Sequence, residues 1–270
     1  MKLTLFINLL LGMMLSSTSI FAQKITNKLQ GFFSASSDTV LISTFSFNGD
    51  GQVEIAGMTD AYYFQKGDSL IVYPDKSIFK FIVKGDKLYG VSDWVKGEVW
   101  IKVKDSAGNN QRTDPELSDY KAKLLHRYYE LKSTTDEWAF LQGVDSSYKT
   151  GIKNLCDSGL SKACLDYAGM MMIERTGIGT LLKADGEKYK MEPSEEIEDC
   201  IHHAIQLGDK NGYTVLAGYY ALIGNITKAK ETLAEGEELG CRRCAMALFD
   251  IEMQEKLKEM ENNEKDSDKE

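Results

Sequence analysis

The chain has 270 residues, and its 41 acidic side chains outnumber its 32 basic ones, which leaves a formal net charge of -9. A surface of this sign repels the phosphate backbone, so we expect no nucleic-acid partner. At about 150 residues per domain, the length corresponds to one or two domains, each able to bury a core.

The first 22 residues have the composition of a secretory signal peptide. One lysine precedes an apolar run from Leu3 to Met14, and small residues lead to Ala22, after which we expect cleavage. An uncleaved anchor is the alternative. After cleavage we expect no membrane insertion, since no later segment is apolar enough to span a bilayer. The sequence therefore predicts an exported protein, periplasmic or secreted.

Residues 23–104 have the pattern of antiparallel β structure. Short apolar and β-branched runs alternate with turn signals such as "NGDG" from Asn48 and "KGD" from Lys66. About seven strands are expected, near residues 39–47, 52–56, 61–65, 69–73, 78–83, 87–92 and 98–104. This number of strands suits a small barrel or a sandwich.

Three segments of this part resemble the small lipocalin-like β domains of exported bacterial proteins: "FSFNGDGQVEI", "DAYYFQKGDSLIVYP" and "FKFIVKGDKLYG". The resemblance implies that the barrel could hold an apolar ligand, as it does in some members of that class. A small barrel can instead fill its interior with side chains, and we favour the filled core. In "EVWIKV", Val99 and Ile101 lie on one face of the strand and Trp100 on the other, so one face is inside and the other meets water.

A polar segment that contains glycine, residues 105–115, forms the expected linker to a helical part. Pro115 suits the first turn of a helix. Apolar residues at three- and four-residue spacing then predict a helical domain over residues 116–255. The tail, residues 256–270, has no apolar residue after Met260 and is predicted to be disordered. The predicted fold class is therefore α+β with two domains.

The helical part contains an internal repeat. Gly159, Gly208 and Gly240 align without gaps, and each is followed by the apolar stripe of a helix and preceded by a shorter helix. The predicted unit is a helix–turn–helix hairpin stacked on its neighbours. Residues 148–255 resemble tetratricopeptide-type repeats of the Sel-like subclass, with an insertion, "ERTGIGTLLKADGEKYKMEP", between the first two copies.

Four of the five cysteines flank the turns of these hairpins. The spacing of Cys156 and Cys164 resembles that of cysteine-rich secreted Sel-like proteins, in which a disulfide ties the two helices of one hairpin, and the turn itself also brings the two residues side by side. Cys241 and Cys244 form a C-x-x-C motif around two arginines, which suits a structural disulfide or thiol–disulfide exchange, and we favour the structural pair. Cys200 falls on an apolar stripe and is expected to be a buried free thiol, although its pairing with Cys241 or Cys244 is the alternative.

No motif in the sequence predicts catalysis, a metal or a cofactor. The three histidines, His126, His202 and His203, stand near no nucleophile and lack the spacing of metal ligands. Our leading interpretation is an exported, non-enzymatic scaffold or adaptor that binds a protein or peptide through its helical repeats. The alternatives are a carrier of a small apolar ligand in the β domain and a thiol–disulfide oxidoreductase that uses Cys241 and Cys244.

The expected binding surface lies on the helix before Gly208. The residues expected on its water-facing side are Glu195, Glu198, Asp199, His202 and Gln206. In the family that the repeats resemble, the first helix of each hairpin lines the concave surface, which implies that this strip is the centre of a groove. A basic or polar peptide segment is then the expected occupant. An ordinary solvated helix face without a partner is the alternative.

Overall fold

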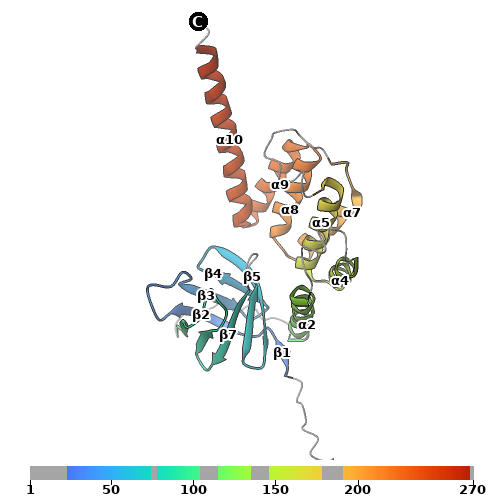
Figure 1. The fold of residues 1–270 in the computed structure, drawn as a ribbon. Helices are drawn as coiled ribbons and strands as arrows, with labels where there is room; N and C mark the ends of the chain where they lie inside the picture. The colour runs from blue at the N-terminus through green and yellow to red at the C-terminus, as the bar shows by residue number, and fades with distance from the viewer. Residues whose placement is uncertain (1–22, 74–77, 104–114, 135–145, 178–190, 268–270) are drawn as a thin grey trace, which may run out of the picture.

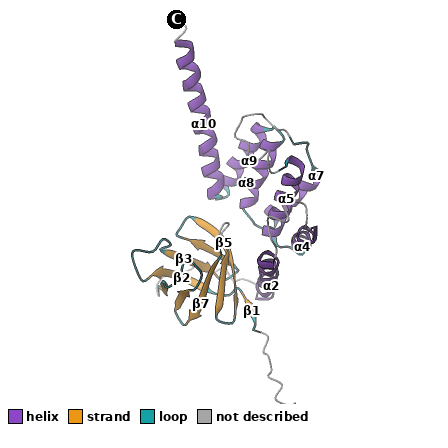
Figure 2. Ribbon diagram, in the orientation of Figure 1, coloured by secondary structure: helices purple, strands orange, loops and turns teal. Residues whose placement is uncertain are grey.

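The computed structural model describes residues 23–73, 78–103, 115–134, 146–177 and 191–267. The expected signal peptide and most of the expected linker lie outside the described residues. Within these ranges, no helix has both the length and the apolar character that a membrane span requires. Figures 1 and 2 show the strands gathered in the N-terminal part and the helices in the C-terminal part, which confirms the predicted α+β layout.

The N-terminal part is a closed antiparallel barrel. Its strands are β1 (Ile25–Thr26), β2 (Gln30–Ala35), β3 (Thr44–Asn48), β4 (Gln52–Ile55), β5 (Thr59–Lys66), β6 (Ser69–Tyr73), β7 (Phe79–Lys84), β8 (Lys87–Gly90) and β9 (Val99–Lys102). They follow the order β1-β5-β4-β3-β2-β9-β8-β7-β6, and β5 also pairs with β6. This last pairing closes strands β2 to β9 into a ring, so the fold is a barrel and not a sandwich. The sequence predicts all of these strands except β1 and β2.

Aromatic side chains fill the inside of the barrel. Trp100 in β9 is buried and donates from Nε1 to the carbonyl oxygen of Ile42 at 3.0 Å, whereas its neighbour Ile101 is exposed. The ring centroid of Phe45 lies 5.3 Å from that of Phe81 and 5.4 Å from that of Trp100, both edge to face. The inner face of "EVWIKV" is therefore the face that carries Trp100. This packing favours the filled core over a ligand cavity.

The C-terminal part is helical. Its described helices are α2 (Pro115–Thr134), α4 (Ser146–Asp157), α5 (Ser161–Thr176), α7 (Glu195–Gln206), α8 (Asn211–Leu222), α9 (Ile226–Glu238) and α10 (Arg242–Ser267). Helix α2 begins at Pro115, as predicted. Helix α10 continues to Ser267, whereas we predicted disorder from residue 256. This segment has no glycine or proline after Gly240 and is rich in residues that favour helix, so the loss of apolar residues alone does not end it.

Three hairpins, α4–α5, α7–α8 and α9–α10, have the same hydrogen bonds in their turns. Gly159, Gly208 and Gly240 all have positive φ, a conformation that glycine adopts without a steric penalty. The next amide in each turn donates to the carbonyl five residues earlier: Leu160 to Leu155, Asp209 to Ala204, and Cys241 to Gly236. This bond satisfies a carbonyl at the end of the first helix. The turn after α8 is of the same type, with positive φ at Gly224 and a bond from the amide of Asn225 to the carbonyl of Tyr220, so the turns alone do not show a repeat, and the repeat and its Sel-like subclass stay predictions.

Helix α2 connects the barrel to the hairpins. Phe64 and Ile71, on the outside of the barrel, belong to one hydrophobic core with Tyr128 of α2 and the other helices. Ser118 of α2 donates to the side-chain oxygen of Asn27, which follows β1, and both residues are buried. The predicted linker therefore separates two parts of the sequence, but a continuous core joins them in space.

Candidate functional site

A polar cleft lies between the barrel and the turns of the hairpins. Strand β5 and the turn before it form one wall, and the starts of α5, α8 and α10 form the other. The charged residues that line the cleft are Asp60, Lys162, Asp166, Asp209, Lys210, Arg242 and Arg243. Both signs of charge are present, so the cleft is not a simple anion or cation site.

Tyr62 of β5 links the barrel to two of the turns. Its hydroxyl donates to Asp209 Oδ2 at 2.6 Å and lies 3.1 Å from Ser161 Oγ. Asp209 also accepts from Ser161 Oγ at 3.2 Å and, through Oδ1, from the amide of Asn211 in α8 at 3.1 Å. Burial, and next the Asp209 carboxylate, raise the pKa of Tyr62 well above its ordinary value of 10.0. The phenol therefore keeps its proton and remains a donor.

Asp209 occupies a position that is apolar in the other two turns. It aligns with Leu160 and Cys241, each of which also follows the glycine of its turn, and all three side chains are buried. A buried carboxylate requires hydrogen-bonding partners. The polar residue Asp209 at an otherwise apolar position was therefore a signal in the sequence for a contact outside the helices. Sequence reasoning missed it because Tyr62 lies 147 residues earlier in the chain.

Arg242 makes a second polar link between the barrel and the helices. It lies in the first turn of α10, where its Nη2 is 2.8 Å from Glu54 Oε2 and its Nη1 donates to the carbonyl oxygen of Gly57. Both charged side chains are well exposed, so the ion pair by itself contributes little stability. Its effect is positional, because it holds the base of α10 against the turn between β4 and β5.

Four of the five residues expected on the water-facing side of α7 are exposed. These are Glu195, Asp199, His202 and Gln206, which we call the α7 strip. The opposite side of α7 carries the buried residues Ile197, Ile201 and Ala204. Helix α7 thus has the amphipathic arrangement that its sequence predicts.

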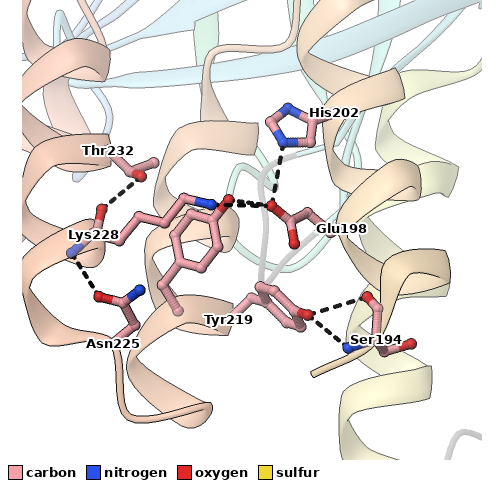
Figure 3. Close-up of polar contacts among 8 residues, drawn as sticks. Ser194, Glu198, His202, Tyr219, Asn225, Lys228 and Thr232 are labelled. Atoms are coloured by element: carbon pink, nitrogen blue, oxygen red, sulfur yellow. Dashed lines mark hydrogen bonds and ion pairs between the residues drawn. The ribbon is translucent and has the colours of Figure 1, made fainter. Parts of the chain in front are cut away.

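Glu198, the fifth residue of the expected strip, turns instead toward α8 and α9 (Figure 3). It accepts a hydrogen bond from the Tyr220 hydroxyl, its Oε1 lies 3.3 Å from Lys228 Nζ, and His202 Nε2 is 3.8 Å from the same oxygen. Lys228 Nζ also lies 4.0 Å from the centroid of the Tyr220 ring. Partial burial acts to raise the pKa of Glu198, but these donors outweigh it and lower that pKa. Glu198 therefore joins three helices.

Both predicted cysteine pairs lie at disulfide distance. Cys156 and Cys164 join the end of α4 to α5, and Cys241 and Cys244 bracket the start of α10. All four are buried, which favours structural pairing over thiol–disulfide exchange. Cys200 is a free, partly buried thiol whose pKa is raised by burial and then by Glu196. Disulfides of this kind fit an oxidising, exported environment.

In the described part of the chain, no group of three or more histidine, cysteine or acidic side chains could hold a metal ion.

Comparisons with protein-family models, with curated proteins and with solved structures find no match for this chain. The geometry of the molecule is therefore the basis for assigning its function.

Proposed function

We propose that the chain is an exported, non-enzymatic adaptor that binds a protein partner through its helical hairpins. The observation that carries this proposal is the α7 strip, a row of exposed polar and acidic side chains on a helix whose other side is buried. A helix fixed on a core presents its side chains at set spacing, so binding orders few groups and loses little entropy. The two carboxylates of the strip suit a basic or polar peptide segment.

The packing of the molecule gives less support to the alternatives. A carrier of apolar ligands needs space inside the barrel, and that space is occupied by aromatic side chains such as Phe45, Phe81 and Trp100. A thiol–disulfide oxidoreductase needs an accessible sulfur, and Cys241 and Cys244 are both buried.

Charge reversal on the strip tests the proposal. The variant Glu195→Lys/Asp199→Lys leaves Glu198 in place, so the contacts between α7, α8 and α9 survive. The matched control, Asp86→Lys/Asp93→Lys, makes the same change of net charge at exposed sites on the barrel. Each protein is used to capture partners from an envelope extract after mild cross-linking, and the captured proteins are identified by mass spectrometry.

We expect one set of proteins to be retained by the wild type and the control and lost from the strip variant. Thermal stability should differ little among the three, since every substituted side chain is exposed, and the loss of the Glu195 carboxylate from the first turn of α7 costs about 1 kcal/mol or less. Equal capture by all three proteins would leave the α7 strip as an ordinary solvated face and overturn the proposal.

A further inference from the structure

Helix α10 extends away from the rest of the molecule, as Figure 1 shows. Near its start, Ala247, Leu248 and Ile251 pack against the helical core. On the other side of the same segment three large apolar side chains face water, and we call them the α10 stripe: Met246 is 68% exposed, Phe249 61% and Met253 40%.

The spacing of the α10 stripe is that of a helix-pairing seam. Phe249 lies three positions after Met246, and Met253 lies four positions after Phe249. This is the spacing of the apolar positions in a heptad. Exposed side chains of this size make a patch of about 300 Å², which is the size of the largest apolar patch on an ordinary monomer, and such patches are often functional. Another exposed apolar side chain, Met58 at 75%, lies near the base of α10, because Arg242 binds the carbonyl of the preceding Gly57.

The charges along α10 identify the occupant. Two arginines stand at its start, Arg243 and Arg242, the second of which also pairs with Glu54, whereas residues 252–267 contain six acidic and three basic residues. An identical helix laid antiparallel places the basic start of each copy beside the acidic end of the other, while a parallel arrangement places like charges together. With a two-fold axis near Met253, the full length of α10 is paired and both stripes are covered. An interface of this kind is isologous, so it closes at two copies.

We propose that the α10 stripe is a homodimer interface, in which α10 pairs antiparallel with α10 of a second copy. The stripe covers less than the roughly 800 Å² per partner of a standard interface. Pairing of the remaining length of α10 must supply the rest. We therefore expect the dimer to be weak and reversible. The inference rests on α10 alone and is independent of the role proposed for the α7 strip.

Sedimentation equilibrium of the chain from residue 23 to 270, at 1 to 200 μM, tests the proposal. We expect a monomer–dimer equilibrium in the wild type, and Phe249→Glu should weaken the dimer at least about 30-fold by placing two carboxylates in an apolar seam. Leu41→Glu is the matched control, because Leu41 is a barrel residue that is 78% exposed; it should dimerise like the wild type. Circular dichroism shows whether each variant is folded, and Met253→Glu serves as the second variant if Phe249→Glu is not.

Three further results bear on the proposal. The dimer should weaken as salt rises, because opposite charges hold its ends. It should persist in a Cys200→Ser background, which excludes a disulfide-linked dimer. A wild type that stays monomeric at 200 μM, or a folded Phe249→Glu variant that dimerises like the wild type, would overturn the proposal and leave the stripe as a surface for another protein.

Discussion

Replacing Tyr62 by phenylalanine removes one hydroxyl and leaves the shape of the barrel surface unchanged. The wild-type hydroxyl lies 2.6 Å from Asp209 Oδ2 and 3.1 Å from Ser161 Oγ, so one atom links β5 to the turns of two hairpins. The substitution therefore weakens the junction between barrel and helices without creating a cavity.

We expect the free energy of unfolding to fall by about 2 kcal/mol, because a hydrogen bond to a charged group contributes about 1.5–3 kcal/mol. The loss stays below the top of that range because Asp209 keeps two other donors. Ser161 Oγ lies 3.2 Å away and the amide of Asn211 3.1 Å away.

Urea unfolding at pH 7, followed by circular dichroism at 222 nm, measures the loss. The matched control is Tyr89→Phe on β8, away from the helices, where the ring lies 5.6 Å from Lys84 Nζ. We expect the control to lose less than about 0.5 kcal/mol. Hydrogen exchange should also rise at the start of α8 in Tyr62→Phe and remain unchanged there in the control.

A loss in Tyr62→Phe no larger than in the control would refute the reasoning. A second substitution, Asp209→Leu, places at this position the residue type that Leu160 has in the equivalent turn. In the double variant neither partner of the bond between Tyr62 and Asp209 is left without the other, so this variant should lose less than the sum of the single losses by about 1 kcal/mol, although Ser161 and the amide of Asn211 lose their acceptor in both variants that carry Asp209→Leu. Additive losses would show that Tyr62 and Asp209 do not interact.

Three other predictions use the same kind of measurement. Burial raises the pKa values of Tyr62 and Tyr63 above 10.0, so the folded chain keeps protons that the unfolded chain releases above that pH. The free energy of unfolding should therefore fall above pH 10 by about 1.4 kcal/mol per pH unit for each tyrosine. Urea midpoints measured between pH 9 and 11 should fall less steeply in Tyr62→Phe than in the wild type. Glu198→Gln should lower the free energy of unfolding by about 1 kcal/mol at pH 7 and by less as the pH falls below 4.5, the ordinary value from which the pKa of Glu198 is lowered; a loss that does not change with pH would contradict the ion pair. The double substitution of Cys156 and Cys164 by alanine should lower the free energy of unfolding by about 2–3 kcal/mol, and peptide mapping without reduction that finds both as free thiols in the wild type would remove the basis for this prediction.

The elements that the sequence predicts correctly are those with local signals. Gly159, Gly208 and Gly240 end helices because each needs a positive φ at the same point of its turn, which is a property of a few neighbouring residues. Strand β1 has only two residues, and β2 pairs with β9, about seventy residues later in the chain. Strand β2 also pairs with its neighbour β3 over five residues, so only the part of its pairing that involves β9 lacks a local signal.

The same distinction applies to the candidate site. The exposure of Glu195 and Asp199 follows from the 3.6-residue period of α7 alone. The position of Glu198 does not, because its partner Lys228 lies 30 residues later and meets it only when α9 packs beside α7 and α8. A residue at the edge between the apolar and the polar face of a helix can point to water or to a neighbouring helix, and the stacking of the hairpins determines its direction.

The junction between barrel and helices also explains why one turn differs from the other two. Leu160 and Cys241 bury apolar groups at the equivalent position, and apolar contacts are not directional, so they would tolerate a shift of the turns along β5. A carboxylate at Asp209 tolerates no such shift, since it must meet the Tyr62 hydroxyl or remain buried without that donor. One polar residue among three equivalent positions therefore sets the register between strand and hairpins, a role in which a buried polar contact contributes specificity more than stability.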